Sequence, residues 1–178
     1  EDARIIPSFE EVKADKDKFI EMFHIFYQNN DPLNAEKLAQ KHGGRWLIQN
    51  PPNFYLEQKE LDKIHELDFE YDAHPYYKKQ GDIKALNTIK FSVNTHRGCY
   101  GECNFCAISV HQGRRIRSRS QESVLREVEK FTKMKNFKGN IYDLGGPTAN
   151  MYDNFCKKMS KKGACKDKRC LSPERCKV

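Results

Sequence analysis

Residues 89–106 read Ile89-Lys-Phe-Ser-Val-Asn94-Thr-His-Arg-Gly-Cys99-Tyr-Gly-Glu-Cys103-Asn-Phe-Cys106, a strand-like run that leads directly into three closely spaced cysteines. Residues 89–94 alternate apolar and polar side chains, which predicts a strand. A helix is predicted over 120–135, with Ser118 or Ser120 as its cap and an apolar face formed by Val124, Val128, Phe131 and Met134. Residues 140–144 predict a second strand. This strand, loop, helix and strand form a βαβ unit with parallel strands. We expect the cysteine loop and Gly145-Gly146 at the carboxyl ends of the strands, where sites gather.

The first 88 residues predict a mostly helical segment followed by a polar connector. A helix capped by Asp15 or Asp17 should bury an apolar stripe formed by Phe19, Met22, Phe23 and Phe26. Residues 34–42 predict a short helix ended by Gly43-Gly44, residues 46–48 a strand, and residues 56–67 another helix. We expect three segments: 1–88, 89–155 as the start of the α/β core, and 156–178 as a tail.

The charge of the chain is concentrated in that tail. The net charge is +7, and residues 156–178 hold nine Lys or Arg against two acidic residues. The chain is 38% hydrophobic and 32% charged, which predicts a thin core or a piece of a larger protein. It has no apolar run of about 20 residues and no signal peptide. We therefore expect a cytoplasmic protein that does not cross a membrane.

The three cysteines have the spacing C-x3-C-x2-C. Thiolates are the usual ligands of iron–sulfur clusters. Cys99, Cys103 and Cys106 can hold three irons of a [4Fe–4S] cluster and leave the fourth iron open, as a catalytic metal site requires. A ferredoxin would show C-x2-C-x2-C and a further Cys-Pro, and a zinc finger two separated pairs. Structural zinc is the remaining alternative.

Two further groups of residues are candidates for binding. Arg114, Arg115, Arg117 and Arg119 follow the cysteine loop and either neutralise a cluster or cofactor or form a solvated stretch, with Arg119 favoured to point inward. The tail carries four cysteines with the spacing C-x8-C-x4-C-x5-C. They are a candidate second metal site or else plain thiols: Cys156, Cys165, Cys170 and Cys176.

The chain resembles the radical S-adenosylmethionine (SAM) superfamily and, within it, the uncharacterised YgiQ-type branch. The resemblance is carried by residues 91–99, the cysteine loop, residues 113–120 and residues 143–152, Asp-Leu-Gly-Gly-Pro-Thr-Ala-Asn-Met-Tyr. In the first half, residues 7–13 and Asn50-Pro-Pro also resemble this branch.

The resemblance implies a [4Fe–4S] cluster on Cys99, Cys103 and Cys106 whose open iron binds SAM. Reductive cleavage of this cofactor gives methionine and a 5′-deoxyadenosyl radical, which takes a hydrogen atom from a substrate. Phe105 would lie against the adenine, and Gly145 and Gly146 would approach the methionine part. Family members commonly have Gly-Gly-Glu there, and Pro147 replaces the glutamate that contacts the amino group.

The resemblance also implies six βα units, of which this chain has room for only part. We expect a fragment of a parallel (β/α) barrel preceded by a mostly helical segment, inactive alone and prone to self-association through its open sheet edge. The parent enzyme would need an electron donor and a substrate that the sequence does not identify. The alternative is a non-catalytic zinc or iron–sulfur module that binds nucleic acid through the basic tail.

Overall fold

The computed structural model describes residues 2–146 and 150–177, and its contacts divide the chain into two compact units. The first unit comprises Glu1–Tyr55, Cys99–Arg115 and Phe155–Val178, and the second comprises Leu56–Gly98 and Ile116–Asn154. Both units combine segments that are distant in the sequence. The boundaries of these units differ from those of the three sequential segments expected above, and those segments remain a prediction.

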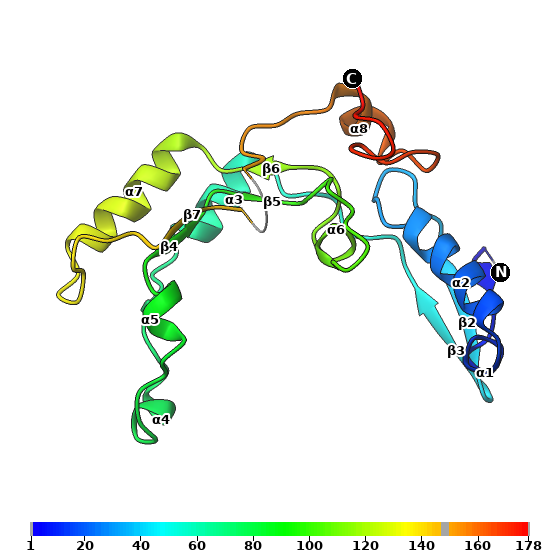
Figure 1. Ribbon diagram of the computed structural model, residues 1–178, viewed down its shortest axis with the longest axis horizontal. Helices are drawn as coiled ribbons and strands as arrows, with labels where there is room; N and C mark the ends of the chain where they lie inside the picture. Colours follow the sequence, from blue (N-terminus) through cyan, green and yellow to red (C-terminus); the bar gives the residue numbers. More distant parts are fainter. Residues whose placement is uncertain (1, 147–149, 178) are drawn as a thin grey trace. The chain divides into compact units, whose positions relative to one another are not determined.

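The first unit contains a three-stranded sheet in the order β1-β2-β3 (Figure 1). Its strands are β1 (Arg4–Ile6), β2 (Leu38–His42) and β3 (Arg45–Gln49). β2 pairs with β1 in parallel and with β3 antiparallel. The helix expected over residues 34–42 is wrong, because β2 forms hydrogen bonds with a strand on both sides. Gly43, with φ at +55°, belongs to the turn of a tight hairpin and does not end a helix.

The described residues of the first unit also form the helices α1 (Phe9–Ala14), α2 (Lys16–Gln28), α6 (Ile108–His111) and α8 (Lys157–Lys162). Asp15 caps α2 as expected, because its Oδ1 accepts a hydrogen bond from the Asp17 N–H at 2.8 Å. The expected burial of the α2 stripe is wrong, since α2 has no buried residue among those described. Phe19 and Phe23 are 49% and 42% exposed and stack on each other with ring centroids 6.2 Å apart.

The second unit contains the predicted βαβ arrangement. Its elements are α3 (Gln58–His65), α4 (Pro75–Lys78), α5 (Leu86–Ile89), β4 (Ser92–Asn94), β5 (His96–Arg97), β6 (Arg117–Ser118), α7 (Gln121–Thr132) and β7 (Asp143–Gly145). β4 pairs with β7 in parallel, which confirms the predicted strand direction, and β5 pairs with β6 antiparallel. β4 begins three residues later than predicted because Ile89 belongs to the helical turn α5.

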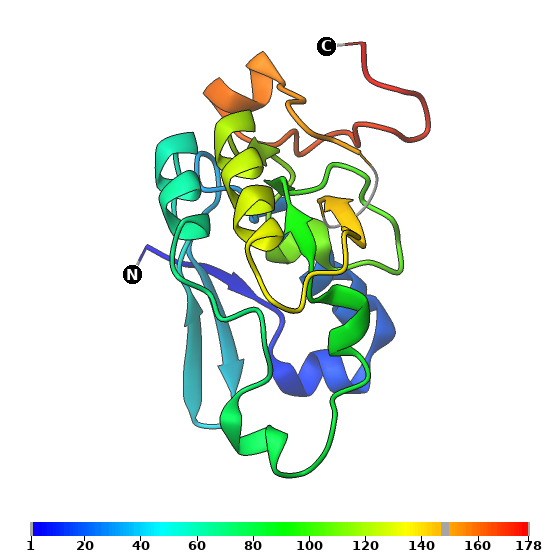
Figure 2. The same cartoon turned by 90° about the vertical axis from the view of Figure 1, so that its left-hand side faces the viewer.

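The core of the second unit lies between α7 and β4. Phe91, Val93 and Phe131 are buried there, and partly buried side chains predicted for the apolar face of α7 pack against them: Val124, Val128 and Met134. α3 and α7 lie side by side (Figure 2). The Ser120 Oγ caps α7 by accepting a hydrogen bond from the Ser123 N–H at 3.1 Å.

The chain is therefore a mixed α/β protein with small sheets. Residues 1–88 were expected to be mostly helical, but they also hold the three-stranded sheet. Outside that sheet, the described residues contain one pair of parallel strands, β4 and β7. Because a (β/α) barrel needs more parallel strands than this pair, a barrel fragment stays a proposal. Within residues 2–146 and 150–177, no helix combines the length and the apolar character that crossing a membrane requires.

Candidate functional site

The three cysteines of the predicted cluster motif lie on one loop of the first unit. Cys99 is buried, Cys106 is half-buried and Cys103 is exposed. The Cys99 N–H donates to the Gly113 carbonyl at 3.0 Å, and its Sγ accepts from the Gly101 N–H at 3.3 Å. Among the described residues, no three potential ligands form a ready metal-binding group. The ligand assignment therefore stays a prediction.

Glu102, inside the cysteine motif, anchors this loop. It is 4% exposed and has a φ of +51°, a left-handed conformation that is unfavourable for a residue with a Cβ. Its carboxylate forms an ion pair with Arg114 at 3.0 Å and accepts a hydrogen bond from the Tyr27 hydroxyl at 3.1 Å. Burial and the Glu102 charge together raise the pKa of Tyr27 to about 12. These contacts fix the backbone directly before Cys103.

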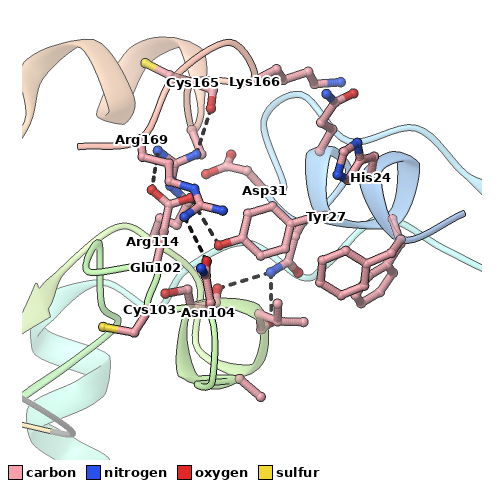
Figure 3. A pocket seen from close by; sticks show the side chains of 18 of the residues that line it. His24, Tyr27, Asp31, Glu102, Cys103, Asn104, Arg114, Cys165, Lys166 and Arg169 are labelled. Atoms are coloured by element: carbon pink, nitrogen blue, oxygen red, sulfur yellow. Dashed lines mark hydrogen bonds and ion pairs between the residues drawn. The ribbon is translucent and has the colours of Figure 1, made fainter. Parts of the chain in front are cut away.

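A cavity of about 580 Å³ lies beside this loop, within the first unit. Figure 3 shows Glu102, Arg114 and Arg169 together on one side, and His24 and Tyr27 of α2 on the other. Members of the cluster motif also line it: Cys103, Phe105 and Cys106. Phe105 is 92% exposed, so its ring is available to stack on a ligand. A ligand in this cavity would contact the cysteine loop directly.

The basic tail is held against the cysteine loop by Arg114. Its guanidinium donates to the Cys165 carbonyl at 2.7 Å and to the Lys168 carbonyl at 3.1 Å. Arg169 donates to the Asn104 Oδ1 at 3.0 Å. The sequence did not predict this docking, because the partners of Arg114 are main-chain carbonyls, which any residue carries. At least part of the tail charge therefore has partners inside the protein.

The four tail cysteines are all half-buried, at positions 156, 165, 170 and 176. Cys156 caps α8 through its Sγ, which accepts a hydrogen bond from the Met159 N–H at 3.4 Å. The Cys170 Sγ lies 3.7 Å from the Arg114 guanidinium, and burial raises the pKa of this thiol. In the part of the tail that is described, these cysteines do not form a group of three ligands. A second metal site stays a prediction.

Arg119 points inward, as expected, and lies in the second unit. Its side chain is 1% exposed and forms an ion pair with Glu127. The guanidinium also donates to the Ser123 Oγ at 2.9 Å and to the Asn94 carbonyl at 2.9 Å. These bonds link α7 to the end of β4, so Arg119 has a clear role in stability. Its contact with a cofactor stays a prediction.

Gly145 ends β7 in the second unit, Gly146 follows the strand directly, and Pro147 falls outside the described residues. Gly146 lies against the imidazole of His96, and a Cβ on this glycine would come within 2.1 Å of the His96 Nε2. Among the described residues, a Cβ on Gly145 would meet only the Asp143 Oδ1, at 3.7 Å. Gly146 therefore has a packing reason to be glycine, in addition to the ligand contact that the resemblance implies.

Sequence reasoning missed the buried side chains of His96 and Glu102, and it named Arg114 only among the four arginines that follow the cysteine loop. Glu102 could have been singled out in the sequence, because it is the acidic residue directly before the second cysteine of the motif. His96 could also have been singled out, because it lies between the predicted strand and Cys99. Their burial depends on segments distant in the sequence, which no local pattern reveals.

Comparison with known proteins gives the family. A family model described as radical SAM N-terminal matches residues 1–92. A UPF0313 protein of Fusobacterium nucleatum is 58% identical over 171 residues, which is 96% of this chain and 30% of that protein. A UPF0313 protein of Methanocella arvoryzae is 50% identical over 171 residues, which is 96% of this chain and 28% of that protein.

A UPF0313 protein of Clostridium botulinum strain Okra is 47% identical over 172 residues, which is 97% of this chain and 27% of that protein. No solved structure matches the chain. The chain thus spans less than a third of the length of these relatives. The matches confirm the resemblance found in the sequence: the chain belongs to the radical SAM N-terminal family, in the YgiQ-type branch of the radical SAM superfamily.

Proposed function

We propose that this chain supplies the cluster loop of a radical SAM enzyme, with Cys99, Cys103 and Cys106 as ligands of a [4Fe–4S] cluster. The observation that carries the proposal is the placement of three thiols on one loop, in a chain of this family. The family model ends at residue 92, before the first of these cysteines, so the assignment rests on the motif itself.

The donor set fits the cluster in its chemistry. Three thiols leave one iron open for SAM, and the Gly101 N–H already donates to the Cys99 Sγ, the kind of hydrogen bond that tunes cluster sulfurs. The chemistry that the group supplies when bound is reductive cleavage of the SAM sulfonium to methionine and a 5′-deoxyadenosyl radical. In the described conformation the three sulfurs are not grouped as ligands of a single metal ion.

The residues around the loop support binding rather than chemistry. Glu102 and Arg114 hold the backbone beside Cys103, and Phe105 offers an exposed ring for the adenine. The proposal includes an external electron donor and a substrate of unidentified structure, which the remaining two thirds of the relatives' length would help to select. Self-association of the isolated chain belongs to the same proposal, and light scattering measures it.

The test is anaerobic reconstitution of the chain with iron and sulfide, followed by reduction and EPR spectroscopy with and without SAM. The proposal expects a [4Fe–4S] signal that shifts when the cofactor is added. Cys103→Ala should abolish this signal. Cys156→Ser is the matched control, because a serine at this position still caps α8.

Two results would contradict the proposal. One is a colourless protein that retains only zinc, which would favour the structural alternative. The other is an unchanged cluster signal in the Cys103→Ala protein, which would show that the ligands are elsewhere. The nucleic-acid alternative has no specific observation in its favour, since tail cations such as Arg169 already have internal partners.

A further inference from the structure

Two of the tail cysteines, Cys170 and Cys176, lie next to each other across a short loop of the first unit. The Cys176 N–H donates to the Cys170 carbonyl at 2.8 Å, which ties the two residues together directly. Standard bond lengths then limit the distance between their Cα atoms to about 6.7 Å. A disulfide forms where the Cα atoms are about 4.4–6.8 Å apart. The backbone therefore holds these two cysteines close enough for a covalent link.

Both sulfur atoms lie beside a positively charged side chain. The Cys170 Sγ accepts from the Arg114 guanidinium at 3.7 Å. The Cys176 Sγ accepts from the Lys168 ammonium at 3.3 Å. Both cysteines are half-buried, so neither thiol is enclosed by the protein. Partly accessible cysteines beside positive charges are the ones that typically react with oxidants.

The other two tail cysteines are placed differently. The Cys156 Sγ caps α8 by accepting from the Met159 N–H at 3.4 Å. Cys165 contacts Arg114 through its main-chain carbonyl, at 2.7 Å. Within the described residues of the tail, the cysteines form no group of three metal ligands. The feature that the backbone does build here is a pair of neighbouring thiols, at positions 170 and 176.

We propose that Cys170 and Cys176 are a redox modification site, at which hydrogen peroxide converts the two thiols into a reversible disulfide. One thiol attacks the O–O bond of the peroxide and becomes a sulfenic acid, and the first molecule of water leaves. The sulfur of the second thiol attacks the sulfenic sulfur. The S–S bond forms, and the sulfenic oxygen leaves as a second molecule of water. The two thiols thus lose two electrons and two protons, which the peroxide takes up.

The pair also lies close to the candidate cluster loop. Arg114, which contacts the Cys170 Sγ, forms the ion pair with Glu102 directly before Cys103. Formation of the disulfide therefore changes a contact of the residue that holds the tail against the cysteine loop. The inference does not depend on the proposed function, because it requires neither the cluster nor SAM.

The test is peptide mass spectrometry of the metal-free chain after treatment with equimolar hydrogen peroxide and alkylation of the remaining thiols. Trypsin cleaves after Arg175, so the two cysteines fall on separate peptides that only a disulfide keeps together. We expect the link between Cys170 and Cys176 to be the main product of oxidation. Dithiothreitol should remove it by thiol–disulfide exchange. Cys170→Ser and Cys176→Ser should each abolish it.

Cys156→Ser is the matched control, because Cys156 is also a half-buried cysteine of the tail and a serine still caps α8. This substitution should leave the yield of the link unchanged. Cys103 gives an internal comparison, since it is the exposed thiol of the cysteine loop. If exposure alone decided reactivity, Cys103 would be oxidised first. The inference expects Cys103 to be recovered in alkylated form when the tail pair is already linked.

Three results would overturn the inference. The first is recovery of Cys170 and Cys176 as separate thiols or sulfinic acids at a peroxide dose that oxidises Cys103. The second is a main link that contains Cys165 in place of either residue. The third is zinc or iron that the purified chain retains and that Cys170→Ser removes, because the two thiols would then be metal ligands. None of these results depends on the EPR test of the cluster, so the two proposals fail separately.

Discussion

The ion pair between Arg119 and Glu127 gives a quantitative test of how the second unit is held together. The two side chains are 1% and 7% exposed, so they are largely removed from water. Removing one partner of such a pair leaves a buried charge uncompensated, at a cost of about 3–5 kcal/mol. Tyr71 also donates to the Glu127 Oε1 at 2.8 Å and would lose its acceptor. We expect Glu127→Ala to lower the free energy of unfolding by that amount.

The control is Arg126→Ala on the same helix. Arg126 forms an ion pair with Glu66, but these side chains are 52% and 41% exposed, and such surface pairs contribute about 0–1 kcal/mol. Urea unfolding followed by far-UV circular dichroism measures both changes. Fluorescence of the single tryptophan, Trp46, reports on the first unit and should be unaffected by either substitution.

A loss below about 1 kcal/mol for Glu127→Ala, equal to that of the control, would refute the reasoning. It would mean that the guanidinium finds sufficient compensation in the Ser123 Oγ and the Asn94 carbonyl, or that water reaches it.

Three further predictions concern the strand end and the cysteine loop. Gly146→Ala should destabilise the second unit by about 1–3 kcal/mol in thermal unfolding because its Cβ meets the His96 ring, whereas Gly145→Ala should be tolerated. Burial lowers the pKa of His96 in the folded state, so the folded state binds fewer protons at this residue than the unfolded state. The free energy of unfolding should therefore decrease as the pH falls below about 6.5, the pKa of the unfolded state. His96→Gln should flatten this pH dependence in urea titrations. Glu102→Ala should remove the ion-pair partner of the half-buried Arg114 and speed alkylation of Cys103, which mass spectrometry follows; an unchanged rate would refute the anchoring role of Glu102.

The sequence predicted the second unit better than the first. The βαβ order, the apolar face of α7 and the Ser120 cap follow from local spacing, and all three are confirmed. The helix expected over residues 34–42 failed because β2 is defined by pairing with β1 and β3, and tertiary pairing overrides helix propensity.

In the candidate site, too, features set by neighbouring residues were predicted, whereas contacts between distant residues were not. The motif of Cys99, Cys103 and Cys106 is local and was visible at once. The burial of Glu102 depends on Tyr27, 75 residues away, and on Arg114, whose other partners lie in the tail. The clash that makes Gly146 a glycine depends on the position of a histidine 50 residues earlier in the chain. Neither contact can be predicted from the spacing of residues in the sequence.

The interleaved composition of the two units bears on the order in which the protein folds during its synthesis. All residues of the second unit have been made once Asn154 is added, so this unit can fold first. The first unit includes residues made before the second unit but must wait for the segment that begins at Phe155. The Asn34 side chain donates to the Lys162 and Ala164 carbonyls, and the Arg114 guanidinium donates to the Cys165 carbonyl. The amino-terminal part of the first unit is thus made before the second unit but reaches its final contacts after it.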